Sequence, residues 1–193
     1  MNFALLRAPS RGLLAFSLAL LTLSLGLSLN APVAHGRSPA KALKGRVILS
    51  TTPFPFKFKS NSAFIKHMKK VDTKAFNLEK GRQTNVELMA FFGKAIKATE
   101  VTATIYDITE KPQEMVETFP IYLQGNKAEQ IVASNFALDL DSYKLERRYM
   151  LVITMGYRGK MLAKTTFAVK ATAAQRAAMK AEQKAAQKAM DME

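Results

Sequence analysis

Six short runs of strand type follow one another between residues 85 and 169, and they constrain the fold more than any other feature of the chain. Each run is rich in β-branched or aromatic residues, and turn-forming residues separate it from the next. The runs span residues 85–92, 100–108, 115–123, 131–138, 148–155 and 161–169. With residues 46–50 as a first strand, the pattern predicts a mainly β fold, an antiparallel β-sandwich of about seven strands.

The last two runs form the clearest hairpin, because Gly156 and Gly159 provide the backbone freedom that a tight reversal needs. Alternation along the two strands predicts which residues face the core: Tyr149, Leu151, Ile153, Met161, Ala163, Thr165, Phe167 and Val169. Lys164 and Lys170 are expected to face solvent. Tyr149 lies where immunoglobulin-like (Ig-like) sandwiches carry their corner tyrosine, so the predicted sandwich is Ig-like. The chain lacks the Cys and Trp of antibody-type domains.

Two helical segments accompany these strands. Ser62 can cap a short amphipathic helix that places Phe64, Ile65, Met68 and Val71 on one face and Lys66, His67, Lys69 and Lys70 outward, so the helix should cover one side of the sheet. Before it, Phe54, Phe56 and Phe58 share one face of an extended segment, where Pro53 and Pro55 favour a sheet edge or irregular backbone. Beyond residue 170, an Ala- and Lys-rich stretch begins with Thr172 and Gln175 at the spacing of a capping box, which predicts an exposed helical tail.

The first thirty-six residues read as an export signal. They contain no acidic residue, carry Arg7 and Arg11, run apolar from Leu13 to Leu29, and end in Ala34-His35-Gly36. Retention of the run as a membrane anchor is an alternative, and a mitochondrial presequence is a third interpretation. We therefore expect a signal peptide at 1–36, a tether at 37–44, the sandwich at 45–170 and the tail at 171–193, in a protein exported to the periplasm or the extracellular space.

The residue inventory excludes several kinds of chemistry. No Cys is present, and His67 is the one histidine besides His35, so thiolate or imidazole metal sites and a Ser-His-Asp triad lack their components. Asp139, Asp141 and Glu146 form the best carboxylate cluster, but Lys144 replaces the glycine of an EF-hand loop, and turn and hydrogen-bonding roles are favoured. No catalytic residue, metal or cofactor is predicted. A hydrolase whose catalytic carboxylates come from distant parts of the sequence is an alternative to the two binding functions given below.

Charge supplies the strongest indication of a binding surface. The net charge is +14, and +12 without the two arginines of the export segment, which draws the protein towards anionic surfaces. A basic patch interleaved with phenylalanines contains Lys57, Lys59, Lys66, Lys69, Lys70 and Lys74. Lysine rather than arginine predominates there, which disfavours bidentate phosphate recognition and a nucleic-acid partner and favours weak, salt-sensitive attraction. The alternative interpretation is the solvated face of an amphipathic element.

Five short stretches of the chain resemble a loose set of uncharacterised exported bacterial proteins with an Ig-like β-sandwich. They are residues 45–50, Pro53-Phe54-Pro55, Phe64-Ile65-Lys66, Met89-Ala90-Phe91-Phe92 and residues 101–107. This resemblance implies the fold alone. The sequence favours a non-enzymatic binding module that contacts another component of the cell envelope, with the lysine patch and the tail as contact regions. The alternative is a peripheral binder of anionic lipid or polysaccharide. The oligomeric state is left open.

Overall fold

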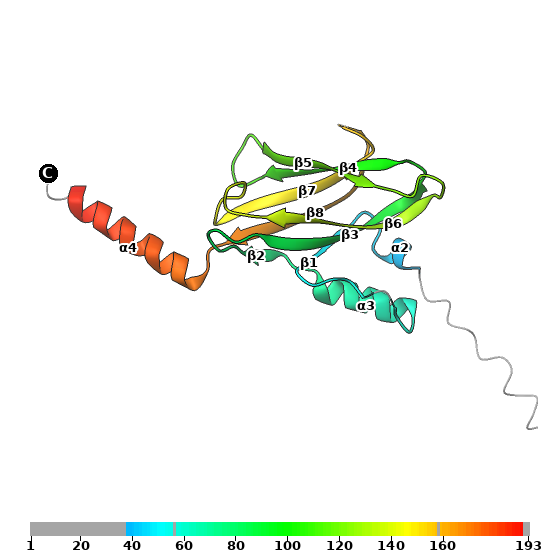
Figure 1. Cartoon of the computed structure of the whole chain (residues 1–193), viewed down its shortest axis with the longest axis horizontal. Coiled ribbons are helices and arrows are strands. Elements are labelled where there is room, and N and C mark those ends of the chain that lie inside the picture. The colour runs from blue at the N-terminus through cyan, green and yellow to red at the C-terminus, as the bar shows by residue number, and fades with distance from the viewer. Residues whose placement is uncertain (1–37, 56, 158, 191–193) are drawn as a thin grey trace, which may run out of the picture. The chain divides into compact units, whose positions relative to one another are not determined.

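The computed structural model describes residues 38–55, 57–157 and 159–190. In this part of the chain two β-sheets pack face to face as a sandwich, accompanied by a few helices (Figure 1). The export segment predicted at 1–36 lies outside the described residues, as do Phe56 and Arg158.

The smaller sheet has three antiparallel strands in the order β1-β3-β6. They are β1 (Val47–Ser50), β3 (Thr84–Ile96) and β6 (Glu129–Leu138). All four residues of β1 are buried, because this sheet is covered on both faces. β3 continues four residues past its predicted end at residue 92, and its pairing with β6 is interrupted between Phe91 and Ile96.

The larger sheet has five strands in the order β2-β8-β7-β4-β5. They are β2 (Ala75–Asn77), β8 (Met161–Lys170), β7 (Arg147–Thr154), β4 (Glu100–Asp107) and β5 (Glu114–Tyr122). The structure corrects the expectation of about seven antiparallel strands, because β2 is an eighth strand and pairs in parallel with β8. Three residues are too short to show the alternation that identified the other strands.

The core between the sheets follows the predicted pattern with one exception. Leu151, Ala163 and Phe167 are buried in it, while Lys164 and Lys170 are exposed. Met161 was expected to face inward but is 52% exposed. A register shift between Ile153 and Thr154 separates Met161 from the regular ladder, so the alternation that places the rest of β8 does not extend to it.

Tyr149 occupies the corner position predicted for it. Its ring is buried at the start of β7, stacked on Phe167 with centroids 5.5 Å apart and edge-on to Tyr143 at 5.2 Å. Its hydroxyl accepts a hydrogen bond from the Lys144 amide at 2.8 Å and donates one to the Lys144 carbonyl at 3.3 Å. One side chain therefore fixes the corner that precedes β7.

A helix covers the outer face of the smaller sheet, as the amphipathic pattern predicted (Figure 1). This helix, α3 (Asn61–Val71), buries Met68 completely against Ile48 of β1 and Phe91 of β3. The cap is Ser60, two residues before the predicted Ser62, because the Ser60 hydroxyl accepts from the Ala63 amide at 3.1 Å. The helix is thus one half-turn longer at its start than expected.

The segments on either side of β1 also join this second core. Short helix α2 (Pro39–Ala42) lies in the stretch interpreted as a tether, and both Ala40 and Leu43 are buried. Phe54 is buried and Phe58 half-buried in irregular backbone, which confirms the shared face for these two phenylalanines. Their rings add to the apolar layer between α3 and the sheet.

The chain ends in helix α4 (Ala173–Met190), and the predicted capping box is formed. The Thr172 amide donates to Gln175 Oε1 at 2.7 Å, and the Gln175 amide donates to Thr172 Oγ1 at 3.3 Å. Met179 on this helix is 40% exposed. Within the residues that the structure describes, no helix is both long and apolar enough to cross a membrane.

Candidate functional site

The structure separates the six lysines of the predicted binding patch into two groups. Lys66, Lys69 and Lys70 are exposed on α3, and Lys57 and Lys59 are exposed on the segment before it. Phe58 keeps that segment beside the helix, because its ring contacts Phe64 at a centroid distance of 4.9 Å. In the described part of the chain, these five lysines have no carboxylate within ion-pair distance.

Lys74 has a different environment from the other five. Its ammonium group lies 2.9 Å from the Asp72 carboxylate and donates to Thr165 Oγ1 on β8 at 2.7 Å. Asp72 also faces the Leu49 amide of β1, at 3.4 Å. Lys74 therefore helps to join the segment after α3 to both sheets, and its charge is neutralised locally.

The helical pattern predicted that His67 points into solvent, but the structure places it against the segment before α3. It is half-buried, and its ring lies 5.3 Å from that of Phe58. The extended segment before α3 folds back over this side of the helix, which the helical period alone cannot show. The contact gives His67 a packing role.

The carboxylate cluster at 139–146 carries out the turn and hydrogen-bonding roles expected of it. The Asp139 carboxylate accepts from the amides of Asp141 at 3.2 Å and Ser142 at 2.9 Å, and the Ser142 hydrogen bond lowers the pKa of Asp139. Glu146, at a positive φ of 57°, accepts from the Ala171 amide at 3.0 Å. Among the described residues, no group of three or more His, Cys, Asp or Glu side chains is placed to hold a metal ion.

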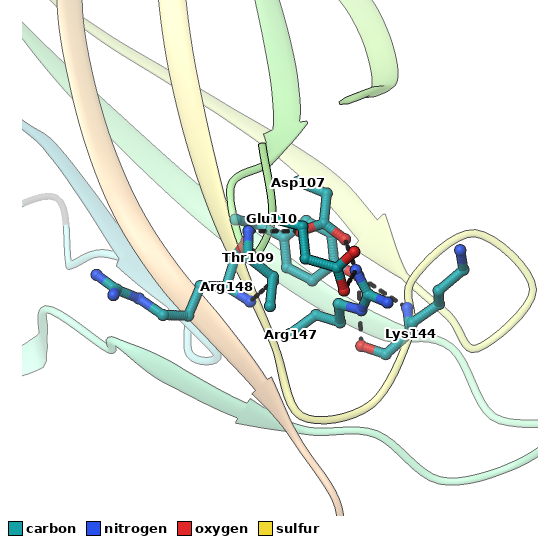
Figure 2. A network of polar contacts seen from close by, with 7 residues as sticks. Asp107, Thr109, Glu110, Lys144, Arg147 and Arg148 are labelled. Atoms are coloured by element: carbon teal, nitrogen blue, oxygen red, sulfur yellow. Dashed lines mark hydrogen bonds and ion pairs between the residues drawn. The ribbon is translucent and has the colours of Figure 1, made fainter. Parts of the chain in front are cut away.

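A second polar network joins the β4–β5 loop to the start of β7, and the sequence did not indicate it. Figure 2 shows the Arg147 guanidinium between two carboxylates, 3.5 Å from Asp107 and 3.1 Å from Glu110. The Thr109 side chain accepts from the Arg148 amide at 2.8 Å, while the Asp107 carboxylate accepts from the Thr109 amide at 2.8 Å. Each carboxylate has a cationic partner, so the network stabilises the loop and leaves no free acid and base pair.

The most distinctive surface lies at one end of the sandwich, beside the turn between β7 and β8. A groove of about 540 Å³ is formed there by the end of β3, the residues after α2 and the hairpin. We call it the lysine-rimmed groove, and its lining residues are Lys44, Gly45, Phe92, Gly93, Lys94, Ala95, Ile96, Lys97, Met155, Lys160, Met161 and Leu162. Its volume falls within the range typical of small-molecule sites, about 300–1,000 Å³.

The groove combines an apolar floor with a cationic rim. Phe92 and Ile96 are buried beneath it, while Met155 and Met161 are 41% and 52% exposed at its side. Methionine adapts its shape to different apolar partners, and exposed apolar groups that cluster indicate an interaction surface. All four charged side chains of the lining are lysines, and no acidic residue lies among them.

Gly93 has a specific role in this groove. A Cβ atom added at this position would lie 2.6 Å from Cε of Lys44, so the Lys44 side chain crosses the strand directly over Gly93 and its flexible end would have to move aside for any larger residue. The aliphatic part of Lys44 then lies over β3, and long cationic side chains commonly cover apolar surface in this way while the charge stays in water. This arrangement extends the apolar lining without burying an ammonium group.

Sequence reasoning missed the groove because its parts lie far apart in the chain. Lys44, Lys94 and Lys160 are separated by about fifty residues or more, and they meet because β1 pairs with β3 and because the residues before β1 contact β8, where the Lys164 amide donates to the Gly45 carbonyl at 3.1 Å. The one local signal was the unexpected pair Met155 and Met161, apolar residues beside glycines in a turn. An apolar residue at an exposed turn requires an explanation that a core residue does not.

Comparison with known proteins extends only to distant structural similarity. No protein-family model matches the chain, and no curated protein matches it. Solved structures of β-glucosidase from Listeria innocua are similar over part of their length. The complex with glucose aligns at 16% identity and a TM-score of 0.29 over 51% of this chain, and the complex with gluconolactone at 15% and 0.29 over 65%. The matched region is only 15% and 16% of those glucosidase chains, and the similarity carries no argument about function.

Proposed function

We propose that this chain is an exported, non-enzymatic binding domain with an Ig-like fold. The strand orders β1-β3-β6 and β2-β8-β7-β4-β5 support the fold, because Ig-like sandwiches divide their strands between two sheets in this interleaved way. The two hydrogen bonds between the Tyr149 hydroxyl and Lys144 support it further. The acid-free apolar segment at the N-terminus supports export.

The ligand class that best fits the lysine-rimmed groove is an anionic amphiphile, a molecule with an alkyl chain and an anionic headgroup. The observation that carries this proposal is the pairing of an apolar floor with four lysines and no acid in one groove. An alkyl chain would displace water from the exposed side chains of Met155 and Met161, and burial of apolar surface is worth roughly 25 cal/mol per Å². The lysine ammonium groups would neutralise the headgroup.

The absence of a competing catalytic arrangement supports a binding role. Within the described residues, Asp107 and Glu110 bind Arg147, and Asp139 binds turn amides. The buried Tyr143 hydroxyl donates to the Glu117 carboxylate at 2.5 Å. These side chains therefore contribute to loops and corners, whereas no carboxylate of the described chain lies within ion-pair distance of the groove lysines.

Calorimetric titration with decanoate tests the proposal. Decanol serves as the uncharged comparison, and dextran sulfate as an anionic polymer without an alkyl chain. We expect decanoate to bind more tightly than either, and the double variant Lys94→Gln/Lys160→Gln to weaken binding by about tenfold, which corresponds to ~1.4 kcal/mol. Higher salt should weaken the remaining attraction.

The matched control is Lys66→Gln/Lys69→Gln, which removes the same charge from α3. Equal binding of decanoate and decanol would contradict a role for the lysines. A loss of decanoate affinity in the α3 variant and not in the groove variant would instead assign binding to the lysine face predicted from the sequence. Preferential binding of dextran sulfate would indicate a polysaccharide ligand.

A further inference from the structure

Three of the four sheet edges in the sandwich are protected against pairing with another strand. β5 carries Glu114, Glu117 and Pro120, and both charge and proline block strand addition. β2 is only three residues long. The free side of β1 is covered by the segment after α3, since the Thr73 amide donates to the Leu49 carbonyl at 2.7 Å.

The fourth edge, β6, is the least protected, because its one charged residue is Glu129 at the very start of the strand. It is ten residues long and pairs with β3 on one side, and no strand among the described residues pairs with its other side. Residues 130–138 include no charged residue, proline or glycine. A long edge of uncharged residues presents a row of main-chain donors and acceptors to any strand that approaches it.

The direction of these main-chain groups follows from the neighbouring ladder. The Phe91 amide of β3 donates to the Arg46 carbonyl beside β1. Main-chain groups alternate in direction along a strand. The odd-numbered residues of this part of β3 therefore turn their N–H and C=O groups towards β1, and the even-numbered residues turn theirs towards β6. The register pairs Ala90 with Val132 and Leu88 with Ser134. The odd-numbered residues of β6 therefore turn their N–H and C=O groups to the free edge.

We propose that β6 pairs antiparallel with β6 of a second copy of this chain, forming one continuous sheet across a two-fold axis at Ala133. In such a pairing, residues whose main-chain groups face the free edge lie opposite each other. These residues of β6 are odd-numbered, so the two residue numbers of each opposed pair add to an even number. With Ala133 opposite its own counterpart, Ile131 lies opposite Asn135. The exposed side chains near the axis, Ala133 and Asn135, are small and uncharged.

Charge complementarity favours a second copy over an unrelated strand. Lys127 lies two residues before β6 and Asp139 directly follows it, and in the described chain neither belongs to an ion pair. In the register centred on Ala133, Lys127 of each copy lies opposite Asp139 of the other. The two ends of this edge carry opposite charges, which match when the strand pairs antiparallel with itself.

The test measures the mass of the exported protein by light scattering after size-exclusion chromatography, over a range of concentrations. We expect a concentration-dependent dimer, and we expect Ala133→Lys to convert it to a monomer, because two lysines would meet on the axis. The matched control is Ala177→Lys on the exposed face of α4, which adds the same charge and should leave the dimer intact.

A cysteine variant tests the register itself. The chain contains no Cys, so Ala133→Cys introduces a single thiol, and opposed residues of an antiparallel pair have Cα atoms about 5.5 Å apart. A short thiol-reactive cross-linker should join the copies of Ala133→Cys and not those of Ala177→Cys. A wild-type protein that stays monomeric, a dimer that survives Ala133→Lys, or a dimer that Ala133→Cys fails to cross-link would overturn the proposal.

Discussion

The substitution Tyr149→Phe tests how much of the sandwich's stability depends on one hydroxyl group. The ring is 1% exposed and is packed against Tyr143 and Phe167, and phenylalanine keeps that packing. What is lost is the partner of both the amide and the carbonyl of Lys144, at 2.8 and 3.3 Å. The change therefore isolates two hydrogen bonds from the apolar contacts around them.

The expected loss of unfolding free energy is about 2 kcal/mol. A typical intramolecular hydrogen bond contributes roughly 1 kcal/mol, and a group left without a partner in a buried place costs about 1–3 kcal/mol. The carbonyl contact is long and Lys144 is exposed, so water can replace part of the loss and the lower half of that range applies. In a domain of this size, the melting temperature should fall by about 4–8 °C.

Urea denaturation followed by circular dichroism measures this difference. We expect the midpoint to fall with an unchanged slope, because the substitution alters the stability of the folded state and not the surface exposed on unfolding. Tyr122→Phe is the matched control, since Tyr122 is 76% exposed and its loss should stay within about 0.5 kcal/mol. If Tyr149→Phe unfolds at the same urea concentration as Tyr122→Phe, the corner hydrogen bonds do not stabilise the fold.

Two further predictions concern the core. Burial raises the pKa of both Tyr143 and Tyr149, with the Glu117 hydrogen bond as a further cause for Tyr143, so each keeps its proton in the folded state when the unfolded chain has lost it. Stability should be unaffected by these groups below about pH 10 and fall as the pH rises above it, and a urea midpoint that stays constant to pH 11 would contradict this linkage. Met68→Ala should lower the free energy of unfolding by about 2–5 kcal/mol, because it opens a cavity beneath α3. The control Met179→Ala, on exposed α4, should lower it little. Equal urea midpoints for the two variants would show that α3 does not stabilise the sheet it covers.

Local patterns predicted the elements whose information lies within a few residues. The β7–β8 hairpin, the outward lysines of β8 and the capping box of Thr172 and Gln175 each depend on neighbours in the sequence, and the structure confirms them. The helix that covers the smaller sheet was also predicted, because its apolar face repeats with the period of a helix. Its cap was misplaced by two residues because Ser60 and Ser62 are chemically equivalent candidates.

Features that depend on distant segments could not be predicted in this way. β2 is recognisable only through β8, which lies about ninety residues later in the chain. The pairing of Lys74 with Asp72 and Thr165 removes one lysine from the predicted patch, and no sequence pattern indicates which lysines find internal partners. The lysine-rimmed groove requires the residues after α2, the end of β3 and the β7–β8 hairpin to meet at one end of the sandwich, so it becomes visible only once the sheets are assembled.

The layering of the molecule limits where it can bind. α3 covers one face of the β1-β3-β6 sheet and the five-stranded sheet covers the other, so the smaller sheet offers partners its ends and its free edge. The lysine-rimmed groove lies at an end and is lined by side chains, which suits recognition of a small amphiphile. The β6 edge presents main-chain groups, which suits another strand. Because the two surfaces use different parts of the sheet, a dimer formed through β6 should leave both copies of the groove accessible, and decanoate affinity should be the same above and below the concentration at which the dimer forms.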